Sequence, residues 1–186
     1  MMTQCRTLTD CPNASPPVTL ALAMTQLLYT NLDVSLDTFP ASAYFFGYMG
    51  VASGLVFANL GASYGTAKSG VGIASLGVID ASKVIKALIP VIMAGILGVY
   101  GIIVAVLLNS KCKDMKSEKQ GYQYLSAGLC CGLSALASGL AIGVAGDAGV
   151  RAYAQTDGIF VGMIILLIFA EAIGLYGMII AIIIMQ

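Results

Sequence analysis

The sequence lacks histidine and tryptophan entirely, and only 10% of its 186 residues are charged. Without histidine there is no imidazole to serve as a general base or metal ligand, so Ser-His-Asp and Cys-His sites are excluded. Nine Lys and Arg balance nine Asp and Glu, so no positive field favours nucleic acid. We therefore expect no nucleic-acid partner, no metal site and no cofactor.

Hydrophobic residues, by contrast, are abundant. They make up 59% of the chain, whereas soluble domains are typically about 45–50% apolar and about 25% charged. A chain this short with so few charges cannot cover a water-soluble surface. The composition predicts an integral membrane protein and argues against a soluble enzyme.

The charges are distributed so that four long stretches are left almost free of them. These stretches are 38–67, 87–110, 120–146 and 159–186, and the last contains a single charge, Glu171. A helix of about 20 apolar residues crosses the hydrocarbon core of a bilayer. The stretches are continuously apolar and do not alternate, which favours helices over a barrel. We predict an all-α membrane protein whose four transmembrane helices span about 42–66, 88–110, 122–146 and 159–185.

Residues 1–40 differ in kind, since they contain no glycine and carry several charges. Within them, residues 17–29 form a mostly apolar stretch that is too short to span a membrane comfortably. It could be the core of a signal peptide with Arg6 as its positive flank. The favoured interpretation is a flexible or interfacial amino-terminal extension.

All 22 glycines lie between Gly47 and Gly177, and many are four residues apart within a span. Such spacing lets helix backbones approach closely in lipid. We therefore expect the first and third spans to pack tightly through their small residues. The pairs are Gly50 with Gly54 and Gly61 with Gly65 on the first span, and Gly128 with Gly132 and Gly139 with Gly143 on the third.

The two halves of the chain resemble each other. Residues 52–55 recur as 137–140, an offset of 85, and residues 98–101 match 174–177, an offset of 76. The difference predicts a longer loop within the first hairpin than within the second. We predict two tandem helical hairpins in parallel orientation, 41–112 and 113–186, built to pack beside copies of the same chain.

Glu171 lies near the middle of the fourth span, and the offset of 76 pairs it with Gly95. An ionised carboxylate at that depth costs at least about 3 kcal/mol. Lipid favours its neutral form and a nearby cation its charged form, so it could bind and release a proton. The alternative is a structural glutamate that hydrogen-bonds a neighbouring helix. Asp147 and Arg151, four residues apart, are expected to pair structurally.

At this point the sequence becomes recognisable. The segment IFAEAIGLYG at 168–177 resembles the proton-carrying segment of the V-type ATPase proteolipids, the c-type ring subunits. Further matching segments lie at 60–73, 89–96, 144–151 and 160–164. The resemblance covers roughly residues 42–186 in order and leaves residues 1–40 as an extension.

The resemblance implies a protomer of a rotating ring in the membrane V0 sector of a proton pump. Glu171 would be the proton carrier, and Tyr176 matches a position implicated in macrolide inhibitor binding. A separate soluble sector would hydrolyse ATP, so this protein would not be an enzyme on its own. The implied partners are copies of the chain, paralogous c-type subunits, the static a-subunit that supplies an Arg, and the d-subunit of the central stalk.

The resemblance also implies the membrane of the vacuole or another acidic compartment, with both termini in the lumen. The positive-inside rule narrowly favours the opposite orientation, because the second loop holds one more lysine than the first. We expect the ion carried at Glu171 to be a proton and not sodium. The residues that flank Glu171 are apolar, whereas a sodium site needs several oxygen ligands.

Two other functions are compatible with four spans and one acid. The first is a structural or pore-forming membrane protein in which Glu171 only joins helices. The second is a small secondary transporter, but Gly95 counts against it, because such proteins place polar groups at both halves of the repeat.

Overall fold

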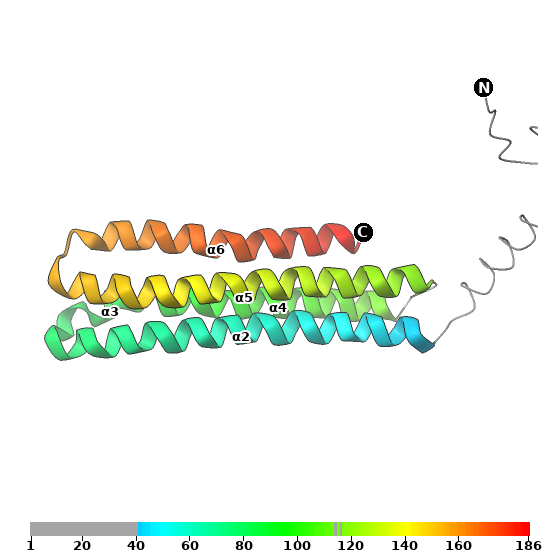
Figure 1. The fold of residues 1–186 in the computed structure, drawn as a ribbon, viewed down its shortest axis with the longest axis horizontal. Helices are drawn as coiled ribbons and strands as arrows, with labels where there is room; N and C mark the ends of the chain where they lie inside the picture. The colour runs from blue at the N-terminus through cyan, green and yellow to red at the C-terminus, as the bar shows by residue number, and fades with distance from the viewer. Residues whose placement is uncertain (1–40, 114, 116) are drawn as a thin grey trace, which may run out of the picture.

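The computed structural model describes residues 41–113, 115 and 117–186, and the elements within these ranges are all helices (Figure 1). The predicted extension, 1–40, lies outside the described residues. The helices are α2 (Ala41–Ile79), the 3-10 helix η1 (Ala81–Lys83), α3 (Val84–Ala87), α4 (Ile89–Cys112), α5 (Glu118–Gln155) and α6 (Ile159–Ile184). Four segments are long and apolar enough to cross a membrane. Three of them are α2, α5 and α6, and the fourth consists of η1, α3 and α4 taken together. The predicted fold class, four membrane-spanning helices, is confirmed.

Two helices run well beyond the spans that the charges predict. The first span is predicted at 42–66, but α2 continues to Ile79, and the third is predicted at 122–146, whereas α5 ends at Gln155. The charges there mark the edge of the apolar stretch and do not end the helix, since Lys68 on α2 pairs with Asp147 on α5 at 3.8 Å. The two helices therefore project as a pair past the predicted apolar region.

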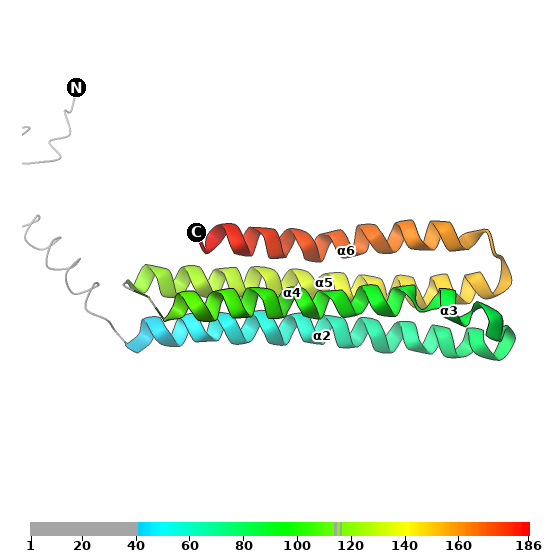
Figure 2. The same cartoon turned by 180° about the vertical axis from the view of Figure 1, so that it is seen from behind.

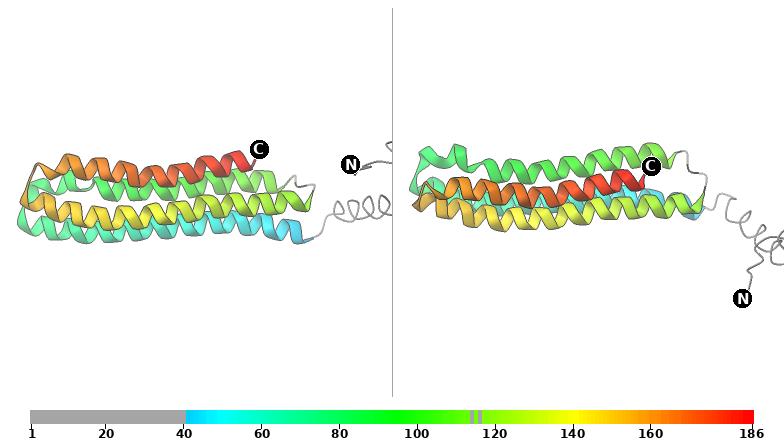
Figure 3. Two further views of the ribbon diagram at one scale, coloured as in Figure 1. Left: turned by 45° about the horizontal axis from the view of Figure 1, so that its top comes forward. Right: turned by 90° about the horizontal axis from the view of Figure 1, so that it is seen from above.

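The four long helices form one elongated bundle (Figures 1 and 2). Helices α2 and α5 lie side by side and run in the same direction, while α4 and α6 return in the opposite direction. Helix α4 packs on α2, α6 packs on α5, and α4 also touches α5 and α6 (Figure 3). The two hairpins are thus arranged in parallel, with α2 and α5 forming the most extensive contact.

The register between the hairpins differs from the predicted offset of 85. A Cβ on Gly128 would meet the backbone of Gly50, and one on Gly139 would meet the backbone of Gly61. The members of each pair are 78 residues apart. The glycines that meet across α2 and α5 are thus related by 78 residues and not by 85. The first connection is nevertheless the longer one, since 80–88 contains η1 and α3 while only 156–158 joins α5 to α6.

The buried core is built largely from small side chains, which suits helices in such close contact. The largest fully buried side chains come from all four long helices: Leu76, Leu97, Leu108, Ile142, Leu167, Val104 and Val150. Large apolar side chains also cover the outside of the bundle, especially on α2 and α6, for example Phe45, Val56, Ile165, Phe169 and Ile183. An apolar exterior of this extent is stable against lipid or against other apolar helices, not in water.

Candidate carboxylate site between the hairpins

The central polar contact of the bundle joins the two hairpins through Glu171. This residue lies midway along α6, and its Oε1 accepts a hydrogen bond from the Tyr100 hydroxyl on α4 at 3.3 Å. Both side chains are half-buried. Tyr100 was not among the site residues predicted from the sequence. The signal that could have found it is the repeat, which sets tyrosine five residues after Gly95 and again after Glu171.

Helix α6 is fixed beside Glu171 by close packing on α5. The hydroxyl of Ser138, which is fully buried, donates to the carbonyl oxygen of Ala170 at 2.7 Å. One turn further on, a Cβ on Gly174 would lie only 2.6 Å from the Leu97 side chain of α4. These contacts bring α4, α5 and α6 together and so set the position of the carboxylate.

The outer surroundings of Glu171 are apolar. Phe169 is 72% exposed, Ile173 48% and Tyr176 61%, so the carboxylate lies beside a surface made for lipid or another helix. Within the described ranges no cation pairs with Glu171. A charge there would have no counter-charge among the described residues.

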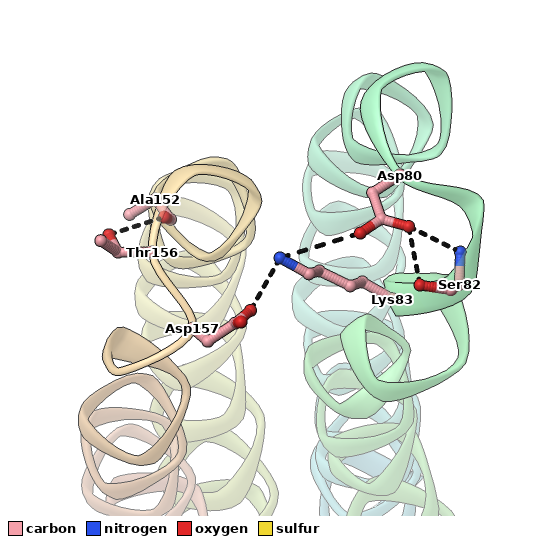
Figure 4. Close-up of polar contacts among 6 residues, drawn as sticks. All are labelled: Asp80, Ser82, Lys83, Ala152, Thr156 and Asp157. Atoms are coloured by element: carbon pink, nitrogen blue, oxygen red, sulfur yellow. Dashed lines mark hydrogen bonds and ion pairs between the residues drawn. The ribbon is translucent and has the colours of Figure 1, made fainter.

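Lys83 forms a cluster of ion pairs at one end of the bundle, where the two connections meet (Figure 4). Lys83 bridges the two connections, with Nζ 2.7 Å from Asp157 and 3.8 Å from Asp80. The Ser82 hydroxyl and backbone N–H both donate to Asp80, and these hydrogen bonds hold the pKa of its carboxyl below the usual value. This cluster closes the end of the bundle, away from Glu171.

The expected pair of Asp147 and Arg151 is present, with Nε 2.8 Å from the carboxylate. Asp147 also meets Lys68 of α2, so the same acid links α2 to α5. The three charged groups satisfy one another, which is consistent with a structural role. No group of three or more potential metal-ligating side chains occurs in the part of the chain that the structure describes.

The glycines named from the sequence lie mainly in the contact between α2 and α5. On α2, a Cβ added to Gly50 or Gly61 would clash with the α5 backbone, while one on Gly54 would lie 3.2 Å from the Gly128 carbonyl oxygen. A Cβ added to Gly65 would contact Gly139 of α5 and Ala94 of α4. A Cβ added to Gly143 would contact Gly65 and Tyr64 of α2. Gly95 is different, since nothing lies within 4 Å of its Cβ position.

Comparison with known proteins places the site in a family context. The family model that describes the C-subunit of ATP synthase matches the chain twice, at residues 49–108 and 125–184. Each match covers one hairpin, and their starting points are 76 residues apart, the offset that relates Gly95 to Glu171.

Full-length relatives show the same similarity. The chain is 52% identical over 157 residues to a V-type proton ATPase 16 kDa proteolipid, c-subunit 2, of Caenorhabditis elegans, covering 82% of this chain and 98% of the relative. It is 54% identical over 153 residues to a V-type proton ATPase 16 kDa proteolipid of Chrysotila carterae, with coverage of 79% and 93%. It is 53% identical over 144 residues to the V-type proton ATPase 16 kDa proteolipid of Homo sapiens, with coverage of 77% and 93%.

Proposed function

The chain belongs to the ATP synthase C-subunit family, among the V-type proton ATPase proteolipids, and on this premise we propose that it carries protons at Glu171 as a component of a membrane rotor ring. The observation that carries the proposal is the position of Glu171. It lies midway along a membrane-spanning helix, at an apolar outer surface, with a hydroxyl as its hydrogen-bond partner and no ion pair to any described cation.

The proposed mechanism depends on how the surroundings of Glu171 change its protonation state. Protonated Glu171 is neutral and can face hydrocarbon at little cost. When rotation brings it to a static partner protein, a fixed Arg there favours the carboxylate and the proton leaves. The Tyr100 hydroxyl holds the side chain in one orientation at both stages, because it can donate to the carboxylate and accept from the acid.

A proton suits this site better than a sodium ion. Hard cations are held by several oxygen ligands at once. The hydroxyl of Tyr100 is the one side-chain oxygen that hydrogen-bonds Glu171 among the described residues. The nearby Ser138 hydroxyl already donates to a backbone carbonyl.

Each chain supplies one such acid for four helices, since Gly95 occupies the equivalent place in the first hairpin. Moving one charge across 100 mV costs about 2.3 kcal/mol. A ring with an acid in every second hairpin moves fewer protons per turn and can therefore build a steeper gradient with the same torque.

We further propose the other components of the complex. ATP hydrolysis takes place in a separate soluble sector, the static a-subunit supplies the Arg, and the d-subunit joins the ring to the central stalk. Paralogous c-type subunits complete the ring beside copies of this chain. We place it in the membrane of the vacuole or another acidic compartment, with its termini in the lumen.

We also propose Tyr176 as part of a macrolide inhibitor site, as the resemblance implies. Its side chain is 61% exposed on the outer surface of α6. In the single chain this side chain is therefore accessible to a lipid-soluble molecule.

The rival interpretation is that Glu171 only joins α4 to α6 through Tyr100. The variant Glu171→Gln distinguishes the proton-carrier interpretation from this structural one. Its amide keeps the shape of the side chain and can hydrogen-bond Tyr100, but it cannot release a proton. We expect a complex that assembles in normal amount yet fails to acidify vesicles on addition of ATP. If Glu171→Gln acidifies vesicles normally, Glu171 is not the proton carrier, and if the ring is lost, the structural interpretation is favoured.

A matched control is Glu118→Gln, which removes an acid at the start of α5, where it accepts a hydrogen bond from Ser42. This acid lies outside the apolar part of the bundle, so pumping should be retained. Glu171→Asp completes the series. It keeps the acid one methylene short of Tyr100 and should retain part of the activity.

A further inference from the structure

The family offset of 76 relates two residues of α4 to two of α6. It pairs Gly95 with Glu171 and Tyr100 with Tyr176. Within the chain, Tyr100 of the first hairpin donates to Glu171 of the second. The equivalent contact of the second hairpin would be made by Tyr176 with a residue in the place of Gly95.

The chain cannot make that second contact with itself. Residues five apart on a helix point about 140° away from each other. Gly95 therefore lies on the side of α4 turned away from Tyr100, and Tyr176 on the side of α6 turned away from Glu171. Both positions are open, since Tyr176 is 61% exposed and nothing lies within 4 Å of a Cβ on Gly95.

We propose that Tyr176 of one copy packs against Gly95 of the next copy, forming an acid-free duplicate of the carboxylate site at each junction between copies. The occupant of this open face is a second copy of the chain, because the contact continues the interface that already joins the first hairpin to the second. This inference rests on the proposed ring.

The packing is complementary in shape. The absence of a side chain at Gly95 leaves space on α4 for the Tyr176 ring, at the position equivalent to that of the carboxylate that Tyr100 contacts. The ring then alternates between interfaces that carry an acid and interfaces that do not. The junction is also directional, since each copy presents Tyr176 on one side and Gly95 on the other.

The test is cysteine cross-linking in native membranes. Gly95→Cys with Tyr176→Cys in one chain should give a ladder of covalently joined copies after mild oxidation, reversed by a thiol reductant. Each single variant measures the background from the five natural cysteines. The matched control is Tyr100→Cys with Tyr176→Cys, which moves the α4 cysteine to the opposite side of the helix and should give several-fold less ladder.

Native electrophoresis of the same membranes distinguishes failure of the proposed contact from failure of the proposed ring. A ring with a ladder specific to the 95–176 pair supports the proposal. An intact ring that gives no such ladder, or gives as much with the control pair, overturns this contact and leaves the proposed function standing. Absence of a ring in the wild-type chain overturns both.

Discussion

The hydroxyl of Tyr100 and the carboxylate of Glu171 lie 3.3 Å apart and connect α4 to α6 across the boundary between the two hairpins. The acid comes from one half of the repeat and its hydrogen-bond partner from the other. The site is therefore complete only when the two hairpins pack together, and each half of the chain depends on the other for it.

Tyr100→Phe should slow proton pumping while the complex still assembles. The change removes one hydrogen bond, worth about 1 kcal/mol, so we expect a loss of up to about fivefold. ATP-driven acidification of vesicles measures it, with the amount of ring determined in parallel. Tyr48→Phe on α2, an exposed tyrosine, should leave the rate unchanged. An unaltered rate in Tyr100→Phe would show that this hydrogen bond has no part in transport.

Gly139→Ala should destabilise the bundle, because the new Cβ would collide with the backbone of Gly61. Overpacking of this kind typically costs about 1–3 kcal/mol, and backbone cannot move aside as a flexible side chain can. Thermal unfolding in detergent and the yield of assembled ring are the measurements. Gly70→Ala is the matched control, since nothing lies within 4 Å of its Cβ. Equal effects of the two changes would contradict the close packing of α2 and α5.

Deletion of residues 2–39 should leave ring assembly intact. The family match begins at residue 49, and the glycines that join α2 to α5 all follow it or lie close to it. Native electrophoresis at matched expression is the measurement. Extending the deletion to residue 53 removes Gly50 and should abolish the ring. Loss of the ring with the shorter deletion would assign the extension a role in assembly.

Gly95→Glu should restore a reactive carboxyl to a chain that carries Glu171→Gln. Position 95 has open space and is equivalent to 171 by the repeat. A hydrophobic carbodiimide reacts with protonated carboxyls in lipid, so labelling should be lost in Glu171→Gln and return in the double variant. Gly70→Glu in the same background, near the charged end of the bundle, should not restore it. Mass spectrometry locates the label, and its absence at position 95 would refute the equivalence.

Asp80 should make stability depend on pH at the charged end. Hydrogen bonds from Ser82 lower its pKa in the folded protein below the ordinary value of 3.8. The carboxyl thus contributes stability that is present above that value and is lost as the pH falls through the lower, folded pKa. The difference in thermal unfolding between wild type and Asp80→Asn should shrink on acidification below about pH 4. A difference that stays constant would mean that the charge of Asp80 does not contribute.

The sequence by itself determined the class of the protein and its most informative residue. Four stretches with almost no charge require four spans, because lipid tolerates neither charge nor unpaired backbone. Glu171 stands out for the same reason, because an ionised carboxylate in the hydrocarbon core has a high free-energy cost. Periodic glycines indicated which spans would pack closely. Each of these inferences depends on local composition, which can be read along the chain.

Only the tertiary structure decided what Glu171 touches and how the hairpins align. Tyr100 is 71 residues away in sequence, and its contact depends on how α4 and α6 pack, which no local pattern specifies. The same holds for the register, where Gly61 meets Gly139 although a four-residue match had suggested another alignment. It holds also for Gly95, whose open surroundings arise from the packing of whole helices. These features depend on contacts between distant segments, and such contacts exist only once the bundle has formed.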